Sequence, residues 1–178
     1  MDSPNSVPQG KGISRVVQVT LDRLAPLLGE WTGRGRGGFP TLEEFDYLET
    51  LRVHRDQDAT YLTYEQNTEL IDSDGRSMRK IHWEAGVIRP LEDGSIELAC
   101  VHGSGRVEVL RGKFLAQEAQ PGRFFLRFES ALIGNDERVR SSSREWNLSG
   151  KHFTYMMKMA TTNVGALTNH LEATLIKK

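Results

Sequence analysis

The side chains of this sequence best suited to chemistry are a few histidines, a glutamate and one cysteine. His82 and Glu84 are two residues apart, so on a strand they share one face and could hold a metal ion together. Two ligands are too few for a zinc site, and we interpret them as a polar pair in the wall of a sheet. Cys100 lies in an apolar segment, which favours a buried, inert thiol. His170, the last histidine, is a candidate metal ligand, although its place near the end of the chain is also typical of a surface residue.

A glycine-rich segment, GEWTGRGRGG over residues 29–38, is the second unusual feature. Glycines this dense indicate a backbone that bends tightly or approaches another strand or a ligand closely, and we expect this segment to form part of a barrel wall. Gly33, Gly35 and Gly38 have the spacing of a dinucleotide-binding fingerprint. That fingerprint needs a strand before it and a helix after it. Here a helical pattern precedes it and Pro40 follows, so we reject a dinucleotide site.

The composition excludes several classes of protein. The chain has 23 basic and 24 acidic residues, whereas a dedicated nucleic-acid-binding protein needs a basic excess to contact phosphates. A single cysteine cannot form an intramolecular disulfide, which favours a reducing compartment. No apolar run approaches the ~20 residues that span a bilayer, and the first residues lack a secretory signal. We therefore expect a cytoplasmic protein that binds neither nucleic acid nor membrane.

The N-terminal part of the chain differs in pattern from the rest. Residues 1–13 are rich in turn-forming residues and are expected to be flexible, and residues 14–178 are expected to form one domain. Residues 14–20 could be a short strand or an extended lead-in. Leucines between positions 21 and 28 recur at helical spacing, which predicts a short helix that ends at Gly29.

After the glycine-rich segment, the pattern changes to alternation between apolar and polar residues. Turn signals such as Gly-rich and Asp-rich pairs separate short alternating runs, and no long helical pattern interrupts them. The expected strands lie around 45–53, 61–64, 81–88, 96–101, 107–110, 124–128, 142–148, 153–161 and 170–176. Short connections favour an all-β, antiparallel, up-and-down meander, and closure into a barrel removes its exposed edges. Closed barrels of this size commonly hold one small ligand.

Several segments, in the same order along the chain, match one known family. A Gly-x-Trp-x-Gly-x-Gly motif is met in full by Gly29, Trp31, Gly33 and Gly35. The other matching segments are 39–41, 45–49, 82–90, 93–97, 104–109, 143–146, 159–162 and 170–173. Together they resemble the nitrobindins, which are haem-binding β-barrels, over roughly residues 21–176.

The resemblance implies a fold, a cofactor and a function. The fold would be a barrel of about ten strands closed by a short helix, with one haem b per chain whose iron is bound by His170. The implied activity is binding of nitric oxide by ferric haem and isomerisation of peroxynitrite to nitrate. Arg138 or Arg140 would bind a haem propionate, since arginine donates bidentate hydrogen bonds to carboxylates. Thr41 and Trp31 are candidates for pocket positions, and for Trp31 a plug between helix and barrel is the favoured interpretation.

Two positions raise questions about the pocket. Arg106 stands where the family commonly has an apolar residue, which would make the pocket more polar. Alternation places His170 on the same face as Glu172, whereas an apolar lumen would take the face of Leu171. A β-bulge near residue 170 would resolve this conflict, and so would an outer face covered by the N-terminal segment.

Two other functions fit the same sequence. One is a non-catalytic carrier of a fatty acid or a similar apolar ligand, which needs an enclosed apolar cavity and no role for His170. The other is a nitric-oxide sensor or store that uses the same haem without turnover. The partners expected in every case are small molecules, and a homodimer is a further expectation.

Overall fold

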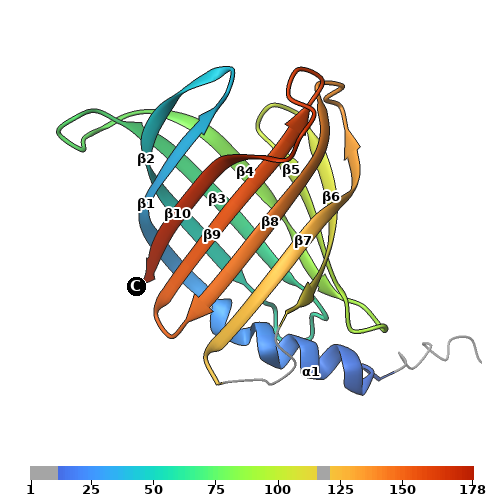
Figure 1. Cartoon of the computed structure of the whole chain (residues 1–178). Helices are drawn as coiled ribbons and strands as arrows, with labels where there is room; N and C mark the ends of the chain where they lie inside the picture. The colour runs from blue at the N-terminus through green and yellow to red at the C-terminus, as the bar shows by residue number, and fades with distance from the viewer. Residues whose placement is uncertain (1–11, 116–120) are drawn as a thin grey trace, which may run out of the picture.

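Ten antiparallel strands form a closed barrel in the computed structural model, which describes residues 12–115 and 121–178 (Figure 1). The strands are β1 (Gly29–Phe39), β2 (Leu42–His54), β3 (Leu62–Ile71), β4 (Ser77–Pro90), β5 (Ile96–His102), β6 (Val107–Phe114), β7 (Arg123–Gly134), β8 (Val139–Ser149), β9 (His152–Thr161) and β10 (Thr168–Lys177). Each strand pairs with its neighbours in sequence, and β1 pairs with β10 to close the sheet. The expected all-β, up-and-down barrel is therefore confirmed.

The helix begins earlier than the sequence pattern predicts. Helix α1 covers Arg15–Leu24, and a 3-10 turn, η1 (Ala25–Leu27), follows it. The expectation of a strand or extended lead-in over residues 14–20 is therefore wrong. Ser14 caps the helix by accepting a hydrogen bond from the Val17 backbone N–H. The β-branched residues of this segment suggested a strand, but packing against the barrel outweighs their intrinsic preference. Residues 1–11, most of the segment expected to be flexible, lie outside the described residues.

The glycine-rich segment forms β1, as expected of a barrel wall, and its glycines make room for aromatic rings. A Cβ on Gly35 would lie 2.2 Å from the ring of Tyr47, and a Cβ on Gly37 would lie 2.2 Å from the ring of Phe45. Both rings belong to β2, which pairs with β1. Glycine is therefore needed here because the neighbouring side chains occupy the space of its missing Cβ.

One end of the barrel is closed by α1 and the other end is open (Figure 1). Leu21, Leu24 and Leu27 are fully buried at the closed end. Trp31 packs beside them, where its indole N–H donates to the Leu27 carbonyl at 2.7 Å and its ring lies 5.8 Å from the ring of Phe153. The helix thus closes the barrel by packing apolar side chains into its end. No helix among the described residues is long and apolar enough to cross a membrane.

Candidate functional site

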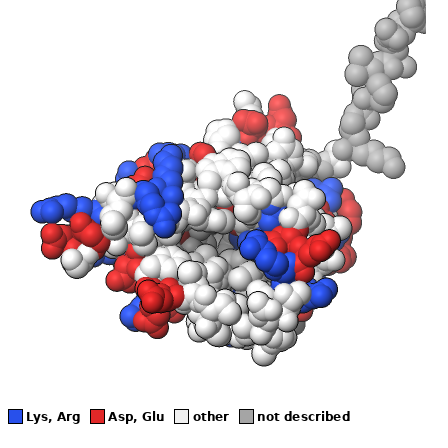
Figure 2. Space-filling model, turned by 90° about the horizontal axis from the view of Figure 1, so that it is seen from above, with Lys and Arg blue, Asp and Glu red and all other residues white. Residues whose placement is uncertain are grey.

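The open end of the barrel gathers most of the residues expected to form a site. Thr41 lies in the turn between β1 and β2, Arg138 in the turn between β7 and β8, and His170 near the start of β10, and these turns share one end (Figure 1). Arg140 lies on β8 next to its turn. Figure 2 looks onto this end and shows a hollow between groups of charged side chains. Four residues that are far apart in sequence are thus placed on the rim of one opening.

His170 is the extra residue of a β-bulge. Asn169 pairs with Lys158 and Leu171 pairs with Met157, so His170 has no partner of its own on β9. The bulge shifts the alternation by one residue. Leu171 consequently lines the interior of the barrel, and the conflict between its face and that of His170 is resolved by the bulge.

The His170 ring is held in one orientation. Its Nδ1 lies 3.1 Å from the backbone oxygen of Gly38, and because a carbonyl can only accept, Nδ1 carries the proton and donates. The edge of the ring packs on Phe39, with centroids 5.6 Å apart. Burial lowers the pKa of His170, and the charges of Arg106 and His82 lower it further, while the bond to Gly38 acts in the opposite direction. No hydrogen bond within residues 12–115 and 121–178 uses Nε2, so its lone pair is available to a ligand.

Thr41, Arg138 and Arg140, the other expected site residues, differ in how close they lie to the hollow beside His170. His170 lines a hollow of about 350 Å³ together with residues of the β1–β2 hairpin, whose turn contains Thr41. Arg138 and Arg140 border a separate hollow of about 660 Å³. The Arg138 guanidinium is 81% exposed and donates to Asp136 at 2.9 Å. Both arginines are therefore on the rim but outside the hollow beside the imidazole.

The Gly-x-Trp-x-Gly-x-Gly motif lies away from this rim. Gly29 and Trp31 begin β1 at the closed end, and Gly33 and Gly35 continue the same strand toward the open end. Trp31 is completely buried between helix and barrel, so it is the plug that we favoured.

A network of buried charges, which the sequence did not reveal, crosses the interior below the open end. The Arg144 guanidinium donates to both carboxylate oxygens of Glu84, at 2.6 and 2.9 Å, and to Glu108 at 3.1 Å. Tyr64 donates to Glu84, and His102 lies 3.2 Å from it. We call these five residues the internal ion network. In the sequence, alternation indicates only that these five residues face inward. It does not show which of them meet across the lumen, because those contacts join strands that are far apart in the chain.

The ion network is electrically satisfied without a metal. His82, Glu84 and His102 place ligand atoms within 4.8 Å of one another, as a metal site would. Burial opposes ionisation, but the charge of Arg144, the hydrogen bonds from His82 and Arg144 and the charge of His102 together outweigh it and hold the pKa of Glu84 well below its ordinary value. Arg144 offsets Glu84, and Arg106, 3.0 Å from Glu108, offsets the second carboxylate. A divalent cation would add two uncompensated buried charges, so we interpret this cluster as structural.

A second polar group fills the interior on the side of β2, β3 and β9. Tyr155 donates to Glu49 at 2.5 Å, accepts from Gln66 at 3.0 Å and lies 3.0 Å from the Tyr47 hydroxyl. Burial raises the pKa of Glu49 to about 7. The cavity between this group and the ion network has a volume of about 30 Å³, room for one or two water molecules. The deep interior is thus filled with side chains.

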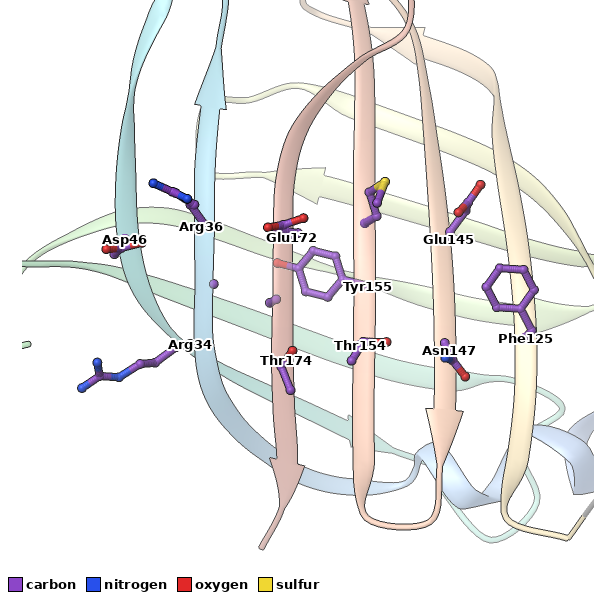
Figure 3. Close-up of a pocket in the computed structure, with 13 residues that line it drawn as sticks. Arg34, Arg36, Asp46, Phe125, Glu145, Asn147, Thr154, Tyr155, Glu172 and Thr174 are labelled. Carbon is purple, nitrogen blue, oxygen red and sulfur yellow. The ribbon is translucent and has the colours of Figure 1, made fainter.

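A shallow groove of about 600 Å³ runs across the outside of the barrel. Figure 3 shows Arg34 and Arg36 on β1, Glu172 on β10 and Glu145 on β8 along it. The groove carries charges of both signs on the outer face, and it shares Arg36 and Glu172 with the hollow beside His170.

Comparison with known proteins identifies the family. The model of the family described as THAP4-like, heme-binding beta-barrel domain matches residues 20–177. The chain belongs to this family. A protein of Arabidopsis thaliana named Peroxynitrite isomerase Rv2717c is 35% identical over 169 residues, which are 95% of each chain. Peroxynitrite isomerase 2 of Mycobacterium ulcerans is 34% identical over 161 residues, 89% of this chain and 94% of that protein. The crystal structure of Rv2717c from M. tuberculosis superposes with a TM-score of 0.76 at 28% identity and covers 93% of this chain and 99% of that one.

The residues of this haem-binding barrel fit an iron porphyrin at the open end. An imidazole that donates through Nδ1 and leaves Nε2 free is the form that ligates iron. Because the deep interior leaves only about 30 Å³, a porphyrin cannot enter it. The haem of this family would therefore lie above the internal ion network, beside His170.

Proposed function

We propose that this chain binds ferric haem b through His170 and isomerises peroxynitrite to nitrate. The observation that carries the proposal is the Nδ1–H bond from His170 to the Gly38 carbonyl, which leaves a neutral imidazole with Nε2 free. The relatives named as peroxynitrite isomerases support the activity, since they align along 89% or more of this chain.

The residues of the rim would have distinct tasks. His170 holds the iron, and the bulge with its Gly38 bond keeps the ring from turning. Arg138 or Arg140 donates to a haem propionate, for which Arg138 must be shared with Asp136. Thr41 lies in the β1–β2 turn between Pro40 and Leu42, which line the hollow beside His170. The filled interior below keeps ligands at the mouth of the barrel.

When bound, haem would supply the redox chemistry of the rearrangement. The mouth of the barrel would hold the reactants together and limit their escape into water. A cytoplasmic location and a homodimer stay predictions.

The alternative of a fatty-acid carrier is disfavoured by the interior. Such a carrier needs an enclosed apolar cavity, but the cavity here is about 30 Å³ and charged side chains lie along it.

The test is haem binding by the His170→Ala variant. We expect the unaltered protein, titrated with hemin, to give a Soret band and to accelerate peroxynitrite decay, and the variant to lose both while its far-ultraviolet circular dichroism is unchanged. His152→Ala is the matched control, because His152 is exposed at the closed end. An unchanged Soret band in His170→Ala would refute the proposal.

A further inference from the structure

The barrel wall opposite His170 carries a cluster of histidine and arginine side chains. In the closed order of ten strands, β5 is five places from β10 in both directions, so it lies across the lumen. His102 ends β5 at the open end, and Arg106 follows in the turn to β6. His82 lies on the neighbouring strand β4, with its ring 5.3 Å from that of His102. We call these three residues the opposite wall.

Arg106 is held firmly in this wall. Its Nη2 lies 3.3 and 3.5 Å from the two ring nitrogens of His102, so the guanidinium rests on the imidazole. Its Nε lies 3.0 Å from Glu108, and the side chain is only 13% exposed. A charged group fixed in this way loses little entropy when it binds a ligand.

Arg106 shares its acidic partners with other arginines. Glu108 is shared with Arg144 at 3.1 Å. Asp136 lies 3.9 Å from Arg106 but is bound more closely by Arg138, at 2.9 Å.

We propose that Arg106, resting on His102 beside His82, forms a subsite for small anions on the side of the pocket opposite His170. The proposal rests on the proposed function, because the anion would lie between the haem and this wall. The ligand class is a small monoanion whose outer atoms accept hydrogen bonds, such as deprotonated peroxynitrite. A neutral ligand such as carbon monoxide gains nothing from the same wall. Arg106 thus sets the preference of this chain for anions.

The test compares anionic and neutral probes on the haem-loaded protein. Dissociation constants for azide and fluoride are measured from the absorbance of the ferric protein, and that for carbon monoxide from the reduced protein. Removing a hydrogen bond to a charged group weakens binding by about 10-fold to 100-fold. We expect Arg106→Gln to weaken both anions by at least about 10-fold and carbon monoxide by less than about 2-fold.

Two further variants make the result specific. Arg111→Gln removes the same charge from the outer face of the adjoining strand β6, where Arg111 pairs with Glu97 at 2.7 Å, and should change no affinity. Arg106→Lys keeps the charge but not the planar group that rests on His102. Its anion affinities should therefore lie between those of the unaltered protein and those of Arg106→Gln. If Arg106→Gln fails to fold, Arg106→Lys decides alone, through an anion affinity about 3-fold or more below that of the unaltered protein.

The outcomes separate the two proposals. Anion affinities that are unchanged in the Arg106 variants, or carbon monoxide weakened to the same extent, would overturn the anion subsite while the dependence of the Soret band on His170 still holds. A Soret band that survives His170→Ala would instead overturn the proposed function.

Discussion

Arg144 and Glu84 face each other across the barrel lumen and form a bidentate ion pair, with Nη1–Oε1 and Nη2–Oε2 distances of 2.6 and 2.9 Å. Their strands, β8 and β4, are four places apart in the sheet, so the pair joins walls that share no backbone hydrogen bonds. Both side chains are at most 5% exposed. The pair therefore braces the barrel directly below the open end.

Removal of Arg144 should strongly destabilise the protein. Arg144→Met leaves Glu84 and Glu108 buried without their shared cation, and breaking such a pair costs about 3–5 kcal/mol. The measurement is the free energy of unfolding in urea at neutral pH. Arg111→Met, which breaks an exposed pair on the outer wall, should cost less than about 1 kcal/mol. A loss below about 1 kcal/mol in Arg144→Met would show that the network contributes little to the brace.

Glu49 should make stability depend on pH in the opposite direction from the ion network. Burial raises the pKa of Glu49 from 4.5 to about 7, so the folded state holds its proton in a range where the unfolded chain has released it. Its contribution to stability is present below pH 4.5 and is lost as pH rises to about 7. Glu108, whose pKa is held at about 2, contributes instead above pH 4.5.

Glu49→Gln should consequently stabilise the protein at pH 8, by on the order of 3 kcal/mol, and have little effect at pH 4. The amide oxygen can still accept from Tyr155, so the hydrogen bond is kept. Unfolding free energies of both proteins at the two pH values test this, with exposed Glu129→Gln as the control. Equal stabilities at pH 8 would mean that Glu49 ionises normally.

Much of the fold could be predicted from the sequence because alternation and turns are local signals. The strands around Ile88, Leu98 and Leu148 were found because their apolar residues alternate in the printed sequence. The start of α1 was missed because its β-branched residues suggested a strand. Val17, Leu21 and Leu24 form the buried face of this helix, and that face is recognisable only when the end of the barrel that covers it is known.

The candidate site, like the fold, could be predicted only in part from the sequence. His170 could be proposed from the family resemblance, but its orientation depends on a bulge that no periodicity shows. Arg144 lies on the inner face of its strand by alternation, yet its pairing with Glu84 depends on how the barrel closes. Contacts across the lumen depend on how the whole sheet closes. Local patterns in a single sequence therefore do not predict them.

Gly35→Ala should destabilise the barrel through a steric conflict. The new Cβ would lie 2.2 Å from the fully buried Tyr47 ring, whose hydroxyl is fixed by Tyr155 and by the Glu172 carbonyl. Forcing extra volume into such a site costs about 1–3 kcal/mol. The melting temperature and urea midpoint measure it. Gly165→Ala, where no atom lies within 4 Å, should change the stability by less than about 0.5 kcal/mol, and a similar loss in both variants would exclude the Tyr47 ring as the cause.

The pKa of His170 should govern haem retention in acid. Burial and the charges of Arg106 and His82 lower it below the ordinary 6.5, so the imidazole stays neutral and able to ligate iron at a lower pH than a free histidine would. Removing a positive charge should reverse part of this effect, and Arg106→Gln should raise the pKa of His170 and move haem release to higher pH. NMR titration of the ring in the haem-free protein and Soret absorbance during acidification of the loaded protein measure the two quantities. Arg111→Gln should leave both unchanged, and a pKa of His170 at or above 6.5 in the unaltered protein would contradict the inference that burial dominates.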